Sequence, residues 1–175
     1  FDSFYSKFFS FDKPNSYLLS KKNLLEWSKI YHSKNKEVTT FILRLEHIVG
    51  PDESPEKFNG WLINKLKNNE TIELGPCDHF FDFIHIDDVV DIYIKLLDIK
   101  NINILNIGTG VGKSIKNIIR YFKKYNIIIA IKNLRKKELK KSTANIKILK
   151  KVLKKKKFIQ LEDFIKNELD KINKK

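Results

Sequence analysis

The chain has 175 residues, 42% of them hydrophobic, which is enough for one folded domain with a buried core and excludes a disordered polymer. Its formal net charge of +14 first suggests a nucleic-acid or other anionic partner. Arginine, which dedicated nucleic-acid surfaces use for bidentate contacts, occurs only at Arg44, Arg120 and Arg135. Lysine therefore carries the charge, and a nucleic-acid partner is not expected.

The cysteine and methionine content bears on disulfide bonds and on where the chain begins. Cys77 is the single cysteine, so a disulfide framework is excluded and a reducing compartment is expected. No apolar run reaches the ~20 residues of a membrane span, and no signal peptide is visible, so no membrane partner is expected. The chain contains no methionine and begins with Phe1, so we expect sequence upstream of it to be missing.

Strands alternate with helices along the chain, as hydrophobic periodicity and turn residues indicate. In chain order, the predicted elements are the end of a strand and a loop over 1–15, a helix over 16–32, a strand over 38–45, a helix over 55–67, strands over 71–74 and 80–86, a helix over 88–98, a strand over 102–107, a helix over 114–125, a strand over 127–131 and helices over 144–153 and 161–169. Ser16 and Asp87 are predicted to cap the helices that follow them. The alternation predicts the α/β class with at least partly parallel strands.

Tyr17 and Lys21 lie four residues apart in the first predicted helix and therefore share one of its faces. An ammonium group beside a phenol favours the ionised phenolate, which makes the phenol useful in proton transfer. The alternative is a surface tyrosine and lysine that merely share a helix face. The spacing alone does not decide between these two interpretations.

The glycine-rich stretch 108–114 matches neither of two nucleotide-binding patterns. A phosphate-binding loop ending in Gly112, Lys113 and Ser114 needs glycine at 107, which is Ile107. A dinucleotide fingerprint starting at Gly108 needs glycine at the position of Lys113. The stretch is therefore predicted to be a tight strand-to-helix turn, and the chain contains no glycine-rich cradle for a pyrophosphate.

Two other clusters of residues, at 77–87 and 150–157, are possible binding sites. The potential ligands Cys77, His79, Asp82, His85 and Asp87 match no standard zinc or calcium spacing, and Asp82 and His85 are predicted to face opposite sides of a strand, so no metal site is expected. The lysine-rich run at 150–157 is interpreted as a solvated helix end and turn, because aromatic side chains do not interleave with its lysines.

Four stretches, in order along the chain, resemble motifs of one family. These are PNSYLLSK at 14–21, which resembles a YxxxK catalytic helix, LRLEHIVGP at 43–51, DFIHIDDVV at 82–90 and LNIGTG at 105–110. The lysine-rich C-terminal part, from Ala144 to Phe164, resembles the closing helices of the same family. The family is the NAD(P)-dependent sugar-nucleotide epimerases and dehydratases, which are extended short-chain dehydrogenases. The stretch from 45 to 58 is most similar to the branch around CDP-abequose synthase and related surface-polysaccharide enzymes.

The resemblance implies a hydride-transfer mechanism with NAD or NADP as the cofactor. Tyr17 is implied to be the acid/base on the sugar, and Lys21 to hold the nicotinamide ribose and favour the ionised tyrosine. Gly50 and Pro51 are implied to lie near the nicotinamide. His47 is implied to lie near the diphosphate of the substrate, a nucleotide-diphosphate sugar. Full-length relatives act in the cytoplasm, often as homodimers paired through the YxxxK helix.

The sequence also departs from the family pattern. Phe81 stands where relatives usually carry an arginine for the substrate phosphate, and Val49 replaces a tyrosine. The catalytic serine or threonine is either Ser3 or a residue upstream of Phe1. The N-terminal strand and GxxGxxG turn, which hold the pyrophosphate, are absent from these residues.

We therefore expect the C-terminal part of a Rossmann-like parallel sheet with a small α/β substrate domain. The Rossmann elements are expected at about 1–50 and 80–125, and the substrate-binding elements at about 51–79 and 126–175. We expect the chain alone to be inactive and to expose an apolar strand edge beside 38–45. Two alternatives remain open. One is a basic nucleic-acid-binding or scaffold protein, and the other is an enzyme that gains its cofactor half from another chain.

Overall fold

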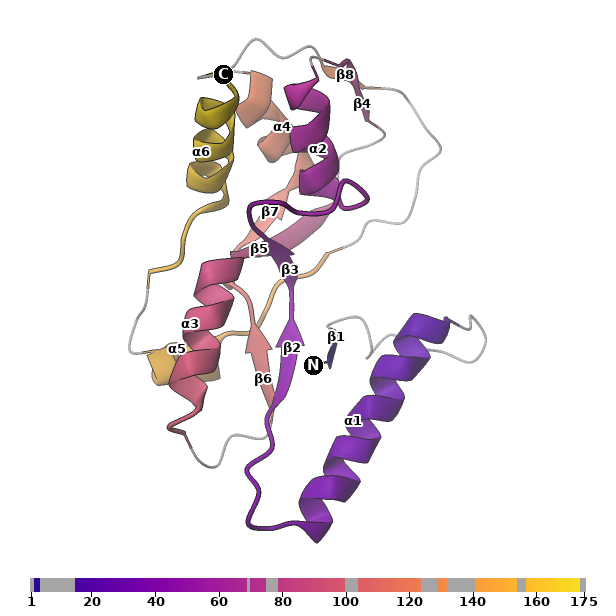
Figure 1. Cartoon of the computed structure of the whole chain (residues 1–175), viewed down its shortest axis with the longest axis vertical. Coiled ribbons are helices and arrows are strands. Elements are labelled where there is room, and N and C mark those ends of the chain that lie inside the picture. The colour runs from indigo at the N-terminus through magenta and orange to yellow at the C-terminus, as the bar shows by residue number, and fades with distance from the viewer. Residues whose placement is uncertain are drawn as a thin grey trace.

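The structure, a computed structural model, describes residues 2–3, 15–68, 70–74, 79–99, 104–123, 129–131, 141–153 and 157–173. Strands and helices alternate along these ranges (Figure 1), which confirms the predicted α/β class. Most of the strand pairs are parallel, as the alternation predicted.

The first sheet is parallel and has the strand order β1-β2-β6. Its strands are β1 (Asp2–Ser3), β2 (Ile42–Leu45) and β6 (Ile104–Ile107). β2 lies in the middle, because it pairs with β1 on one side and aligns Ile42 with Ile104 on the other. The expectation of an exposed edge at this strand is therefore wrong. Among the described strands of this sheet, the open edges belong to β1 and β6.

The remaining strands form two further small sheets. The second sheet has the order β3-β5-β7, and the third pairs β4 with β8. Their bounds are β3 (His47–Val49), β4 (Ile72–Leu74), β5 (Phe80–His85), β7 (Gly112–Ser114) and β8 (Ile129–Ile131). β5 pairs in parallel with β3 and antiparallel with β7. Because Glu46 separates β2 from β3, the chain passes from the first sheet to the second at this one residue.

The helices surround two hydrophobic cores. They are α1 (Ser16–Lys34), α2 (Phe58–Lys67), α3 (Ile86–Leu96), α4 (Ile115–Lys123), α5 (Lys147–Leu153) and α6 (Leu161–Asn173). One core joins α2, α4 and α6 to β3, β4 and β5 and includes the buried side chains of Leu62 and Ile165. The other joins α3 and α5 to β2 and β6 and includes Ile92 and Leu105. β5 contributes Phe83 to the first core and Ile84 to the second.

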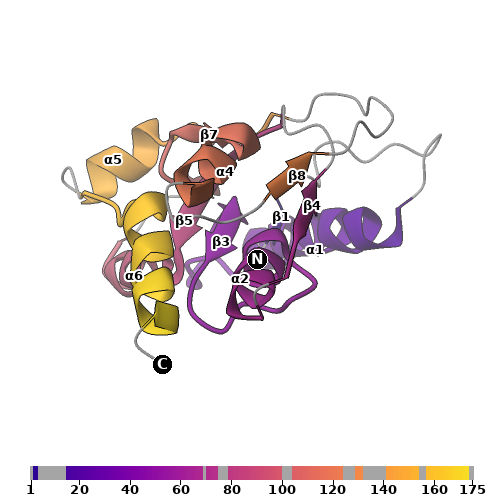
Figure 2. The same cartoon turned by 90° about the horizontal axis from the view of Figure 1, so that it is seen from above.

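The helix α1 stands apart from both cores. Figures 1 and 2 place it on the side of the molecule opposite α3 and α5, with β1 as its principal neighbour. None of its residues, all of which are described, is buried. No helix in the described ranges is both long and apolar enough to cross a bilayer.

Several element boundaries differ from those predicted. β2 starts only at Ile42, α2 starts at Phe58, and the short strands β3 and β7 were not predicted. The cap of α1 is Asn15 rather than Ser16, since the Asn15 side chain accepts a hydrogen bond from the Leu18 amide. The cap of α3 is His85 rather than Asp87, because its Nδ1 accepts from the Asp87 amide at 3.3 Å.

Candidate functional site

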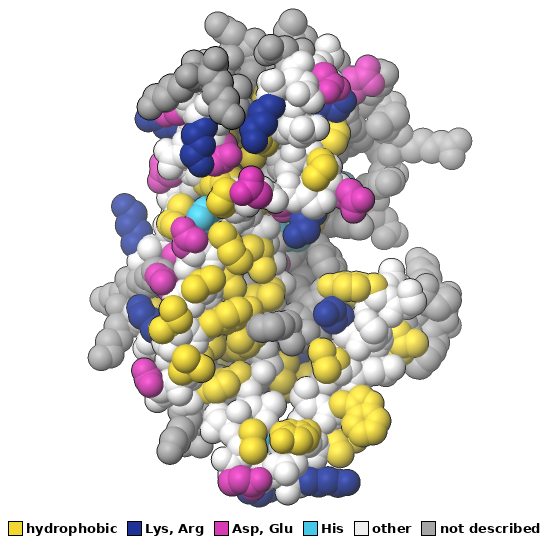
Figure 3. All heavy atoms as spheres, in the orientation of Figure 1, with side chains coloured by type: hydrophobic (Ala, Val, Ile, Leu, Met, Phe, Trp, Pro, Cys, Tyr) yellow, Lys and Arg dark blue, Asp and Glu magenta, His cyan; other side chains and the backbone are white. Residues whose placement is uncertain are grey.

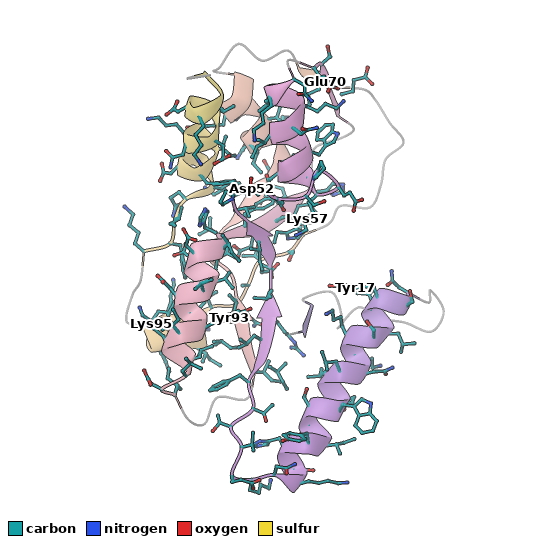
Figure 4. The ribbon with its side chains drawn as sticks, in the orientation of Figure 1. Tyr17, Asp52, Lys57, Glu70, Tyr93 and Lys95 are labelled. Carbon is teal, nitrogen blue, oxygen red and sulfur yellow. The ribbon has the colours of Figure 1, made fainter. Side chains whose placement is uncertain are left out.

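The first candidate site lies on the N-terminal turns of α1. Tyr17 is 55% exposed, and the Nζ atom of Lys21 lies 5.5 Å from the centre of its ring. The pair therefore shares one helix face, as its spacing predicted, and the ammonium lies over the ring in a cation–π contact. Figure 4 places Tyr17 at the end of α1 that is nearer to the loop carrying Asp52 and Lys57.

The loop after β3 begins with the predicted Gly50–Pro51 turn. Gly50 is buried against the first residue of α3, and a β-carbon at this position would lie only 2.6 Å from Ile86 Cγ2. Glycine thus allows the end of β3 to approach the start of α3 closely. Pro51 is exposed, and Asp52 follows it with φ of 57°, a left-handed conformation that turns the chain towards α2.

His47, the first residue of β3, lies in an aromatic cluster. Its ring centre is 4.4 Å from that of Phe81 and 5.5 Å from that of Phe83. Desolvation by burial lowers the pKa of His47 from 6.5 to about 4, against the opposing influence of the nearby Asp82 carboxylate. His47 is therefore a neutral imidazole at neutral pH. It can offer a hydrogen bond to a ligand but no positive charge.

The lowered pKa of His47 predicts a pH-dependent stability. Between pH about 4 and 6.5 the unfolded chain binds a proton at this imidazole that the folded chain does not. The free energy of unfolding should therefore rise with pH across this window, by about 2–3 kcal/mol at most. Urea unfolding at several pH values should show this rise in the wild-type chain and a shallower slope in His47→Gln. An unchanged slope in His47→Gln would contradict the assignment.

Asp82 is the best-connected side chain of β5. It is fully buried, and its Oδ1 accepts hydrogen bonds from the amide of Thr109 at 2.9 Å and from the hydroxyl of the same residue at 2.5 Å. Its Oδ2 accepts from the amides of Gly110 at 2.8 Å and Ala144 at 3.2 Å. Asp82 therefore ties the turn after β6 and the segment before α5 to β5.

A second buried carboxylate lies beside this network. Glu46 accepts a hydrogen bond from the Ser142 hydroxyl, and both side chains are buried. Gly108 lies between Glu46 and Asp82, since a β-carbon there would be 2.6 Å from Asp82 Oδ2 and 3.0 Å from Glu46 Cγ. The glycine turn, which lacks the spacing of a phosphate-binding loop, thus packs against carboxylates that would repel a phosphate at that point.

The structure brings some of the predicted site residues together and leaves others apart. Tyr17 contacts Lys21, and His47 and Gly50 belong to β3 and its C-terminal end. Asp82 was considered only as a potential metal ligand and no metal site was expected there, whereas the structure gives it the turn amides as partners. The signal that could have indicated this role is the glycine turn at 108–110, whose amides need acceptors.

The other residues considered as sites from the sequence are a metal-ligand cluster, a lysine-rich run and Ser3. Among the described residues, no three ligand-type side chains gather to hold a metal ion, and Cys77 lies outside the described ranges. Lys154 to Lys156 of the lysine-rich run also lie outside them, as does the side chain of Ser3.

Comparisons with known proteins add to this geometry. The family model described as "NAD dependent epimerase/dehydratase family" matches residues 5–108. A CDP-abequose synthase from Salmonella muenchen is 38% identical over 117 residues, which cover 66% of this chain and 40% of that protein. The chain spans about two fifths of the length of the curated relatives it matches.

Solved structures share the fold. An NAD-dependent NDP-hexosamine 5,6-dehydratase involved in tunicamycin biosynthesis is similar with a TM-score of 0.76 and 23% identity, over 93% of this chain and 55% of the other. A UDP-glucuronic acid 4-epimerase from Bacillus cereus, in complex with UDP-glucuronic acid and NAD, has a TM-score of 0.73 and 25% identity, over 95% of this chain and 56% of the other. These similarities confirm the expected Rossmann-like fold.

Proposed function

This chain belongs to the NAD-dependent epimerase/dehydratase family, and from that premise we propose that it forms the part of an enzyme that acts on the sugar of a nucleotide-diphosphate sugar. The similarity to CDP-abequose synthase supports a role in the synthesis of a surface polysaccharide. In this proposal the cofactor is NAD or NADP.

The observation that carries the proposal is the pairing of Tyr17 with Lys21 on an open helix face. The phenol is more than half exposed, so a sugar hydroxyl can reach it, and the ammonium lies 5.5 Å from the ring centre. A buried tyrosine could not exchange a proton with a substrate, whereas this one can. The arrangement therefore fits a nicotinamide cofactor and a sugar that meet at this face.

The proposed mechanism assigns one task to each residue. A bound nicotinamide would supply the hydride acceptor or donor for a carbon of the sugar. Tyr17 takes the proton of the sugar hydroxyl as the carbonyl forms and gives it back in the reverse direction. Lys21 stabilises the negative charge that the Tyr17 oxygen carries before it takes this proton, and it would donate hydrogen bonds to the cofactor ribose. Gly50 and Pro51 form the neighbouring wall of the cofactor site.

We place the nucleotide end of the substrate beside His47. The neutral imidazole and the ring of Phe81 form a largely apolar surface next to the Gly50 turn. Such a surface suits a base or ribose better than a doubly charged phosphate. Lys57, which precedes α2 and is exposed, is the first cation after the turn and is proposed to meet the diphosphate.

These 175 residues contain no GxxGxxG turn, so we propose that they are inactive on their own. In this proposal the Rossmann elements are those at about 1–50 and 80–125, and those at about 51–79 and 126–175 bind the substrate. The apolar side chains that α1 exposes (Figure 3) support a homodimer of the whole enzyme through this helix. They are Leu24, Trp27, Ile30 and Tyr31.

Calorimetric titration of the chain with CDP-abequose tests the substrate class. We expect CDP-abequose and CDP to bind, and cytidine to bind at least tenfold more weakly, because it lacks the diphosphate. His47→Ala should weaken binding about three- to tenfold through the loss of one hydrogen bond. Equal binding of CDP and cytidine, or no binding of CDP at millimolar concentration, would contradict the proposal.

A further inference from the structure

A small cavity lies away from the Tyr17 helix, where the linker into α6 crosses the turn between β6 and β7. Its volume is about 190 Å³. Its walls come from β5, the β6–β7 turn, β7, α5 and the segment 157–161. The linker is on the side of the molecule opposite α1 (Figure 1), so this cavity is separate from the proposed catalytic face.

The cavity is lined by an excess of positive charge. Lys113, Lys150 and Lys157 contribute to its walls. Lys113 is neutralised by Glu162, whose two carboxylate oxygens each lie 2.7 Å from its Nζ. Among the described residues, neither Lys150 nor Lys157 has an acidic partner within ion-pair distance. Two ammonium groups at the cavity are therefore available to a ligand.

Two further carboxylates that bond to residues of the cavity wall are already engaged. Asp88 accepts a hydrogen bond at 2.7 Å from the amide of Ile159, which fixes the linker against α3. Asp82 holds the amide and hydroxyl of Thr109 from beneath the turn. Both carboxylates are buried, so they shape the walls rather than compete with an anion for the two lysines.

Most of the rest of the lining is apolar, and Thr109 and Gln160 add polar groups. Phe83 and Leu161 are buried in the adjoining core, and Phe158 and Ile159 form the linker wall. Val111, at the tip of the turn, is 56% exposed and forms part of the rim. A ligand that fills this cavity must therefore combine a small apolar body with a negatively charged end.

We propose that this cavity is a binding site for a small phosphate monoester with an apolar or planar substituent. Phosphate monoesters carry nearly two negative charges at neutral pH, which matches the two lysines that lack acidic partners. The ammonium groups of Lys150 and Lys157 bind the phosphate oxygens. The substituent packs against Phe158, Ile159 and Val111, and the volume excludes a whole dinucleotide.

Phenyl phosphate is the probe that tests this site. Titrated into the ¹⁵N-labelled 175-residue chain, it should shift the amide resonances of Val111, Lys113, Ile159 and Leu161, and it should bind at least tenfold more tightly than inorganic phosphate or phenol. Inorganic phosphate lacks the apolar contact and phenol lacks the charge. Binding no tighter than that of inorganic phosphate would overturn the proposal.

Two sets of variants distinguish specific binding of phenyl phosphate in this cavity from the general attraction of an anion to a basic chain. Replacing Lys150 and Lys157 together by glutamine should weaken phenyl phosphate binding at least tenfold. Replacing Lys147 and Lys151, which are exposed on α5 outside the cavity, removes the same charge and should leave binding unchanged. Val111→Glu, at an exposed position, should also abolish binding by adding a negative charge to the rim. An equal loss of phenyl phosphate affinity in the two double-lysine variants, or tight binding of phenyl phosphate by Val111→Glu, would overturn the proposed site.

Discussion

Tyr17→Phe should reduce turnover by a factor of about 10² to 10⁴ in an enzyme that carries this chain, because the variant cannot transfer the proton of the sugar hydroxyl. The assay uses a chimera in which the chain replaces the matching region of the CDP-abequose synthase from Salmonella muenchen, which supplies the remainder of the protein. The rate of nicotinamide reduction with CDP-abequose is the measurement. The KM for the sugar should change little, since the phenyl ring keeps its place over Lys21.

The matched control is Tyr31→Phe, because Tyr31 is on the same helix and is similarly exposed. It should leave turnover unchanged. Lys21→Ala should lower turnover and also raise the KM for the cofactor, because the lysine has both a charge-stabilising and a binding role in the proposal. If Tyr17→Phe and Tyr31→Phe have the same small effect, Tyr17 is a surface residue and the proposed catalytic pair is wrong.

Asp82→Ala should lower the free energy of unfolding by about 3–5 kcal/mol, the largest effect on stability expected for a single substitution at the site. Four donors from Thr109, Gly110 and Ala144 would lose their acceptor, and the site is fully buried. Denaturant unfolding of the 175-residue chain measures this change.

Two further variants show whether the hydrogen bonds cause the loss. Asp82→Asn keeps the shape and one acceptor oxygen, so it should cost about 2 kcal/mol. Asp98→Asn, in the exposed turn after α3, should cost less than about 0.5 kcal/mol. An Asp82→Ala variant as stable as the wild type would contradict the role given to the network.

The sequence predicts the type of most elements but not how they join. The apolar, β-branched stretch over 38–45 predicts one strand, yet the regular strand β2 starts at Ile42 and a new strand follows Glu46. The break depends on distant partners: the Glu46 amide donates to the Ile107 carbonyl of β6, and the next residue aligns with Phe83 of β5. Local periodicity carries no information about such a change of sheet.

The candidate site is also predictable only in part, because some of its contacts join segments that are distant in the sequence. The spacing of Tyr17 and Lys21 is a property of one helix, so it indicates their shared face correctly. The four donors to Asp82 come from segments 27 to 62 residues away, and no local pattern brings them together. Likewise, hydrophobic periodicity predicts the first helix but not its packing, and none of its residues is buried in the structure.

The most direct test of the proposed function is whether hydride transfer depends on a nucleotide sugar. The purified chimera is mixed with NAD⁺ or NADP⁺, and nicotinamide absorbance is followed as CDP-abequose is added. We expect reduction of the nicotinamide that requires CDP-abequose and is lost in Tyr17→Phe. A correctly folded chimera that binds the cofactor and CDP-abequose but transfers no hydride would contradict it.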